Sequence, residues 1–144
     1  MKRELQMQLV EAYPSFFREY GGDWRLTRMA DGCAHGNGWF GIVKRLCEAI
    51  REECDTDPDA RENFRFEQIK QKAGLLRIYH AGGNARIAAL IQEAEQESAW
   101  VCEDCGATEA LVPRPAQGWV PTLCPRCFET RQSRWKRRED EARS

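Results

Sequence analysis

The chain has 144 residues, a formal net charge of −1 and 31% charged residues. This length suits one domain, or one domain with a small metal-stabilised appendage, and we favour the second arrangement. The near-zero net charge excludes a global basic field for nucleic acid, so a nucleic-acid role requires a local patch. The sequence begins with charged residues and has no apolar run long enough to span a bilayer, which predicts a soluble protein without membrane contact. Its seven cysteines, in a pattern typical of a reducing compartment, predict the cytosol.

The first forty residues predict one short helix followed by loops. Residues 2–13 suit a helix that ends at Pro14. Phe16 and Phe17 are expected to anchor the chain to a core. The glycine-rich stretch 20–38 is expected to be largely loop.

The clearest helix follows Gly36-Asn-Gly38, which we interpret as its lead-in. A phosphate-binding loop is excluded there, because no Lys-Ser or Lys-Thr pair follows and no strand precedes it. We expect the helix to end near Cys54, with the acidic run 55–59 as a solvated linker; a cation site in that run is the alternative. Its apolar residues recur at helical spacing and predict a buried stripe: Trp39, Ile42, Val43, Leu46, Cys47 and Ile50.

The next segment changes from helical to alternating periodicity. Residues 64–69 and 75–80 predict two strands of a hairpin. Asn84 is a suitable N-cap for a further helix that ends near Ser98. Trp100 is expected to pack on the cysteine motif that begins two residues later.

Two Cys-x-x-Cys pairs, Cys102/Cys105 and Cys124/Cys127, have the spacing of a structural zinc ribbon with one Zn2+ ion. Between them, residues 109–112 and 119–123 predict two short strands. The alternatives are disulfides, which an intracellular protein does not keep, and a rubredoxin-like iron centre, which colour would distinguish from zinc. Four cysteine ligands leave no open position for water or substrate, so the motif argues against enzyme chemistry.

Several segments together resemble a family of small uncharacterised phage and prophage proteins, over roughly residues 36–127. The segments that carry the resemblance are 36–40, 69–79, 91–98, 102–106 and 119–124. The resemblance implies a phage-encoded accessory protein acting in the bacterial host cytoplasm, and it implies no particular activity. It carries over the four metal cysteines. The chain departs from the family pattern at Ala73, where an aromatic residue is usual, and at Ala34-His35.

Other cysteines and histidines offer weaker candidate sites. Cys33 and His35, with Cys54 or His80, could form a second metal site, but the spacing is not diagnostic; an exposed thiol and a solvated imidazole are the simpler expectation. Cys47 is expected in the core. His80 near Asn84 suggests an HNH-like nuclease, a hypothesis disfavoured because neither histidine has a recognisable hairpin-helix metal context. No catalytic set or small-molecule substrate is indicated.

The predicted fold is α+β: a helical and β-hairpin body (1–99), a four-cysteine zinc ribbon (100–128) and a basic/acidic helical tail (129–144). We expect a non-enzymatic protein that binds a host protein or complex, for example to modulate transcription or inhibit a defence system. Nucleic-acid binding is the alternative, disfavoured because acidic residues accompany the basic ones. Either partner would contact aromatic and basic side chains near the C-terminus: Trp119, Arg126, Arg131, Arg134, Trp135, Lys136, Arg137 and Arg138.

Overall fold

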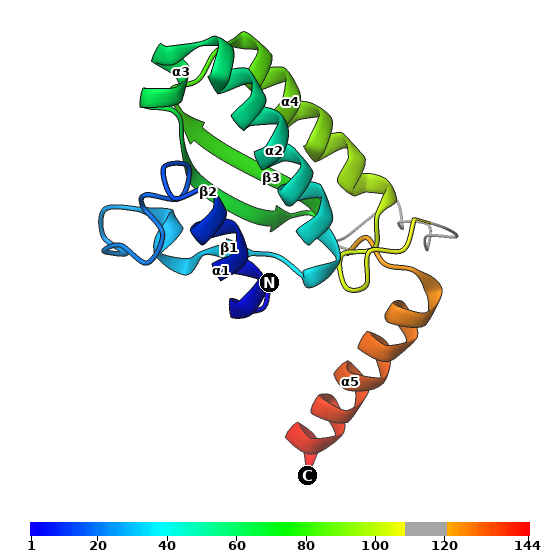
Figure 1. Ribbon diagram of the computed structural model, residues 1–144. Helices are drawn as coiled ribbons and strands as arrows, with labels where there is room; N and C mark the ends of the chain where they lie inside the picture. The colour runs from blue at the N-terminus through cyan, green and yellow to red at the C-terminus, as the bar shows by residue number, and fades with distance from the viewer. Residues whose placement is uncertain (109–120) are drawn as a thin grey trace.

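The computed structural model describes residues 1–108 and 121–144. Within these ranges the chain forms five α-helices, short 3-10 turns and a three-stranded sheet, which confirms the mixed α and β composition (Figure 1). The elements are α1 (Arg3–Ala12), β1 (Cys33–Ala34), α2 (Phe40–Thr56), α3 (Pro58–Asn63), β2 (Arg65–Lys72), β3 (Leu75–Ala81), α4 (Ala85–Glu97) and α5 (Pro125–Arg143).

Helices α2 and α4 lie side by side and cover one face of the sheet (Figure 1). The predicted apolar stripe of α2 is buried as expected, and a 3-10 turn over Asn37–Trp39 leads directly into this helix. Asn84 caps α4 as predicted, since its side-chain oxygen accepts a hydrogen bond of 2.9 Å from the backbone N–H of Ile87. The two helices bury their apolar faces against each other and the sheet.

The sheet has the order β1-β2-β3. Strands β2 and β3 are antiparallel with Ile69 opposite Ile78, so the predicted hairpin is confirmed. Its two-residue turn places Ala73 and Gly74 at positive φ (51° and 81°), the conformation that a tight hairpin turn requires. Strand β1 runs parallel to β2 within the segment expected to be loop, and its two residues are too few to show a periodic pattern.

The free edge of β3 is covered by side chains from the end of α4. The backbone N–H of Leu76 donates to Ser98 Oγ (2.9 Å), and that of Ile78 donates to Glu95 Oε1 (2.9 Å). Unpaired N–H groups on an exposed edge strand can pair with a strand of another chain. These two hydrogen bonds satisfy two such groups and so disfavour that pairing.

The aromatic residues after α1 pack against the hairpin. Phe16 and Phe17 are both buried, which confirms the prediction that they anchor this segment. The ring of Phe16 meets Phe64 edge-on at 5.2 Å between centroids, and Phe17 contacts Phe66 at 5.0 Å. The N-terminal segment is thereby fixed to the sheet.

The acidic run 55–59 is largely exposed to solvent, as expected, but it is not a linker. Helix α2 continues to Thr56 and α3 begins at Pro58. The Asp57 side chain between them accepts hydrogen bonds from the backbone N–H of Ala60 (3.1 Å) and from Asn84 Nδ2 (2.9 Å). Asp57 therefore caps α3 and ties it to the start of α4, a role that composition does not distinguish from solvation.

Candidate metal centre

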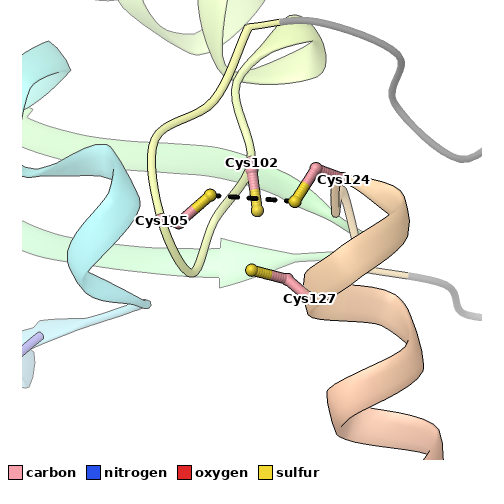
Figure 2. A group of neighbouring side chains, drawn as sticks. All are labelled: Cys102, Cys105, Cys124 and Cys127. Carbon is pink, nitrogen blue, oxygen red and sulfur yellow. Dashed lines mark hydrogen bonds between the residues drawn. The ribbon is translucent and has the colours of Figure 1, made fainter.

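Four cysteines from two separate segments meet at one point. Cys102 and Cys105 lie on the loop that follows α4, and Cys124 and Cys127 lie at the start of α5 with their sulfurs turned toward the first pair (Figure 2). The ligand atoms all lie within 4.8 Å of one another. The structure therefore brings together the four residues that the sequence predicts as one site.

The spacing of the sulfurs suits a metal ion and not disulfides. All seven cysteines are free, and Cys105 Sγ lies 3.7 Å from Cys124 Sγ, far beyond the ~2.05 Å of an S–S bond. Tetrahedral ligands at a metal–sulfur distance of ~2.3 Å are about 3.8 Å apart. The Cys105–Cys124 separation matches one edge of such a tetrahedron.

The first pair of cysteines is held by a tight backbone turn over residues 102–107, which we call the first knuckle. The backbone N–H of Gly106 donates to the Cys102 carbonyl (2.9 Å), and the N–H of Cys102 donates to the Ala107 carbonyl (2.8 Å). Gly106 has φ of 82°, a left-handed conformation that glycine adopts without steric strain. The turn aims both sulfurs at the same point.

The second pair is positioned by the start of α5. Cys124 immediately precedes Pro125, the first helical residue, and accepts at its carbonyl the N–H of Phe128 (2.9 Å). The backbone N–H of Cys127 is the main cause that lowers the pKa of Cys124 to about 7, whereas burial, followed by the neighbouring thiols, raises the pKa of Cys127. Four adjacent thiolates repel one another, so their joint deprotonation requires a cation between them.

The first knuckle is docked on the glycine lead-in of α2. The backbone N–H of Gly38 donates to the Glu103 carbonyl (2.7 Å), and that of Gly36 donates to Glu103 Oε1 (3.1 Å). A Cβ on Gly38 would lie 2.0 Å from the carbonyl oxygen of Cys102, so no side chain fits there. Because Gly36 and Gly38 have no side chain, their backbone can approach the first knuckle closely.

A tryptophan joins the knuckle to the body, but it is not the one that the sequence suggested. The side chain of Trp100 is 71% exposed, so the prediction that it packs on the knuckle is wrong. Trp39, which is fully buried, donates its indole N–H to the Val101 carbonyl at 2.8 Å. Cys102, the first cysteine of the cluster, follows Val101 directly, so this hydrogen bond fixes the position of the backbone that leads into the cluster.

Helix α5 is anchored at its start and free afterwards. Arg131 binds Asp104 of the first knuckle with two guanidinium nitrogens, one of them at 2.8 Å, and this carboxylate is the main cause that raises the pKa of Arg131. The ring of Phe128 packs against the small buried cluster that contains Cys102 and Leu123. Every residue from position 132 onward is exposed, and α5 projects from the body (Figure 1).

Cys33 and His35 are not the exposed loop groups that we expected. Both are buried, and burial raises the pKa of the Cys33 thiol to about 12 and lowers that of the His35 imidazole to about 4. Cys47 is buried as predicted, and Cys54 is buried with it. In residues 1–108 and 121–144, the four-cysteine cluster is the one group with metal-ligand geometry, so these residues form no second site.

His80 lies near the end of the predicted hairpin and is followed by the predicted helix. It is near the end of β3, and Asn84 caps the helix that follows. The His80 ring contacts the Gly82 carbonyl (3.2 Å) and lies against the ring of Phe64. No cluster of metal ligands surrounds His80 in the described part of the chain.

The candidate contact residues are distributed over α5. Trp119 and most of the two expected connecting strands lie outside the described residues, and positions 121–123 form no strand. Arg131 is half-buried in its ion pair, and Trp135 is 40% exposed. The remaining candidates on α5 are exposed: Arg126, Arg134, Lys136, Arg137 and Arg138.

No protein-family model, curated protein or solved structure matches this chain. In the described ranges, no helix combines the length and the apolar character needed to cross a membrane.

Proposed function

We propose that this chain is a non-enzymatic binding protein in which one zinc ion, held by Cys102, Cys105, Cys124 and Cys127, has a structural role. Four cysteine ligands fill a tetrahedral site and leave no position for a substrate or an activated water. Soft thiolate ligands in a tetrahedron select zinc or iron, and zinc is our proposal. The ion would join the first knuckle and α5, two segments that share few apolar contacts.

The observation that carries this proposal is the contrast along α5. Its N-terminal end holds two ligands, Cys124 as the N-cap and Cys127 in the first turn, together with the Arg131–Asp104 ion pair, yet its nineteen residues include no buried side chain. An exposed isolated helix is marginal in water, so a helix that is fixed at one end and otherwise uncovered is suited to receive a partner. We propose that α5 is the recognition element.

Two classes of partner follow from the sequence: a host protein or complex, and nucleic acid. The resemblance to phage and prophage proteins supports an accessory role in the cytoplasm of a bacterial host, such as modulation of transcription or inhibition of a defence system. Both partner classes would use the exposed aromatic and basic side chains of α5.

Site-specific photo-crosslinking in bacterial cells tests the role of α5. A photoreactive amino acid replaces Trp135 on α5 or, as the matched control, Trp100 on the body; both native side chains are exposed. We expect a discrete adduct from position 135 and none from position 100. Protease or nuclease sensitivity of the adduct then identifies the class of partner. Adducts from position 100 alone would contradict the proposal.

An enzyme assay tests the other half of the proposal. We expect no hydrolysis of nucleic acids or simple esters by the zinc-loaded protein. A metal-dependent nuclease activity that is abolished by His80→Ala, with the four-cysteine site still loaded, would show that the protein is an enzyme with an HNH-like centre.

A further inference from the structure

A cleft of about 540 Å3 lies where α5 leaves the body. One wall is formed by Lys2 and Asn37, and another by Asp104 of the first knuckle. The third wall is formed by the first turns of α5, with the side chains of Arg126, Cys127, Thr130, Arg131 and Arg134. Cationic side chains thus approach the cleft from both ends of the chain.

The charges in this cleft do not cancel. Its carboxylate, Asp104, is already bound by Arg131. Within residues 1–108 and 121–144, no carboxylate forms an ion pair with Lys2, Arg126 or Arg134. The cleft therefore carries an excess of positive charge that a ligand can neutralise.

Three arginines on the body differ in this respect. Arg65 pairs with Glu19 at 3.1 Å and Arg77 with Glu95 at 3.3 Å, and Arg45 pairs with Glu97. Carboxylates within reach thus occupy these guanidinium groups. The unpaired cations of α5 are available to an external anion.

Four of the seven basic residues of α5 share one side of the helix, where one of its four acidic residues also lies. Arg126, Arg134, Arg137 and Arg138 fall on one arc of about 120° of the helix circumference, which we call the basic arc. Before Glu139, the one acidic residue of α5 is Glu129, and it lies outside this arc. Glu141 also lies on the arc, one helical turn after Arg137, and ends the run of basic residues along it.

The basic arc is long enough to contact several phosphates of one nucleic-acid strand. At ~1.5 Å rise per residue, Arg126 and Arg138 are about 18 Å apart along the axis, which spans several successive phosphates of a nucleic-acid strand. Trp135 lies three residues before Arg138, about 60° outside the arc, and is 40% exposed, so its ring can stack on a base beside the arc. A row of unpaired guanidinium groups suits phosphate oxygens, which accept two parallel N–H bonds from one arginine.

We infer that the basic arc of α5 and the cleft at its base bind the phosphate backbone of a nucleic acid. This inference rests on the proposed role of α5 as the recognition element. Of the two classes of partner proposed for α5, it selects nucleic acid. The cleft holds one phosphate between Lys2, Arg126 and Arg134. The exposed part of the arc follows the next phosphates along the strand.

Fluorescence anisotropy of the full-length, zinc-loaded protein with a short labelled DNA, as single strand and as duplex, tests the inference. We expect binding of at least one form at low salt. Three phosphate contacts, one in the cleft and one each at Arg137 and Arg138, predict a loss of affinity on the order of 40-fold between about 50 and 200 mM NaCl. The absence of binding to both forms at the lower salt concentration would overturn the inference.

Matched variants then test the location. Arg126→Gln with Arg134→Gln removes two charges from the cleft, whereas Arg28→Gln with Lys44→Gln removes two exposed charges from the body. We expect at least a tenfold loss of affinity and a shallower salt dependence for the first pair, and less than about a threefold loss for the second. Circular dichroism and zinc content verify the fold of each variant. Equal losses would overturn the assignment.

Competition distinguishes nucleic acid from an acidic protein surface. Poly-glutamate of matched charge should displace the DNA at least tenfold less effectively than unlabelled DNA does, because it lacks the phosphates and bases. Equal displacement would overturn the inference and favour an acidic protein. A protein adduct at position 135 without DNA binding would refute the nucleic-acid inference while leaving α5 as the recognition element.

Discussion

The indole N–H of Trp39 donates a 2.8 Å hydrogen bond to the carbonyl oxygen of Val101, across the boundary between the body and the metal knuckle. Trp39 leads into α2, and Val101 directly precedes the first cysteine of the cluster. Both residues are buried. The position of the four-cysteine cluster thus depends on the start of α2.

Trp39→Phe should destabilise the protein by about 1–3 kcal/mol, because it leaves the buried Val101 carbonyl without its donor. Trp100→Phe is the matched control. Its ring is 71% exposed, so its free energy of unfolding should change by less than about 0.5 kcal/mol. Urea denaturation of the zinc-loaded proteins measures both values. Equal effects of the two substitutions would show that Trp39 does not hold the knuckle.

Gly38→Ala should displace the first knuckle, because the added Cβ would lie 2.0 Å from the Cys102 carbonyl oxygen. We expect a loss of roughly 1–3 kcal/mol in stability and faster release of metal to a chromogenic chelator. Gly41→Ala is the control. Its Cβ would meet only the end of the Arg45 side chain at 3.4 Å, and alanine favours the helix by about 1 kcal/mol. Unchanged metal release in Gly38→Ala would contradict the docking described above.

Much of the fold was predictable from local patterns. The stripe from Trp39 to Ile50, the alternation on either side of Ala73-Gly74 and the cap at Asn84 each depend on residues close in sequence. The four cysteines were predictable for a different reason. Two short turns of fixed spacing determine the chemistry of such a site almost independently of the remaining chain.

Features that depend on tertiary contact were not predictable. Asp57 caps a helix and binds Asn84, yet in the sequence it belongs to an acidic run. His35 is buried because the metal knuckle and the N-terminal segment come together around it. On α5, the acidic residues suggested a diluted basic field, whereas the helical arrangement places four arginines on one arc with a single carboxylate, Glu141. That arc favours nucleic acid, although a protein partner remains the sequence-based prediction.

The buried imidazole of His35 should make stability depend on pH. Burial lowers its pKa from 6.5 to about 4, and its Nε2 has no hydrogen-bond partner among the described residues. Between these pH values the unfolded chain binds a proton that the folded chain does not, so stability falls as the pH decreases. The loss should approach roughly 3 kcal/mol at pH ~4.

Urea denaturation between pH ~7 and ~4.5 measures this dependence. In His35→Gln the part of the acid destabilisation due to His35 should disappear, and the part due to protonation of the cysteine cluster should remain. His80→Gln, at a half-exposed position, is the control and should retain the full pH dependence. The same dependence in His35→Gln as in the wild type would refute the role of His35.

Ser98→Ala should expose the edge of β3. The Ser98 hydroxyl accepts the Leu76 N–H at 2.9 Å, and its loss leaves that buried donor unsatisfied, at a cost of about 1–3 kcal/mol. We also expect faster exchange of the Leu76 amide, measured by NMR. Ser133→Ala on exposed α5 should leave both quantities nearly unchanged. Slow exchange at Leu76 in the Ser98 variant would show that Ser98 does not protect this edge.

Metal content after purification tests the central claim most directly. Elemental analysis should find one zinc per chain in the wild type and in Cys47→Ser, because Cys47 is buried in the core away from the cluster. It should find little or none in Cys124→Ser, which lacks one of the four ligands. Loss of zinc from Cys47→Ser but not from Cys124→Ser, or a metal-free wild-type protein that retains its fold, would contradict a structural zinc site at these four cysteines.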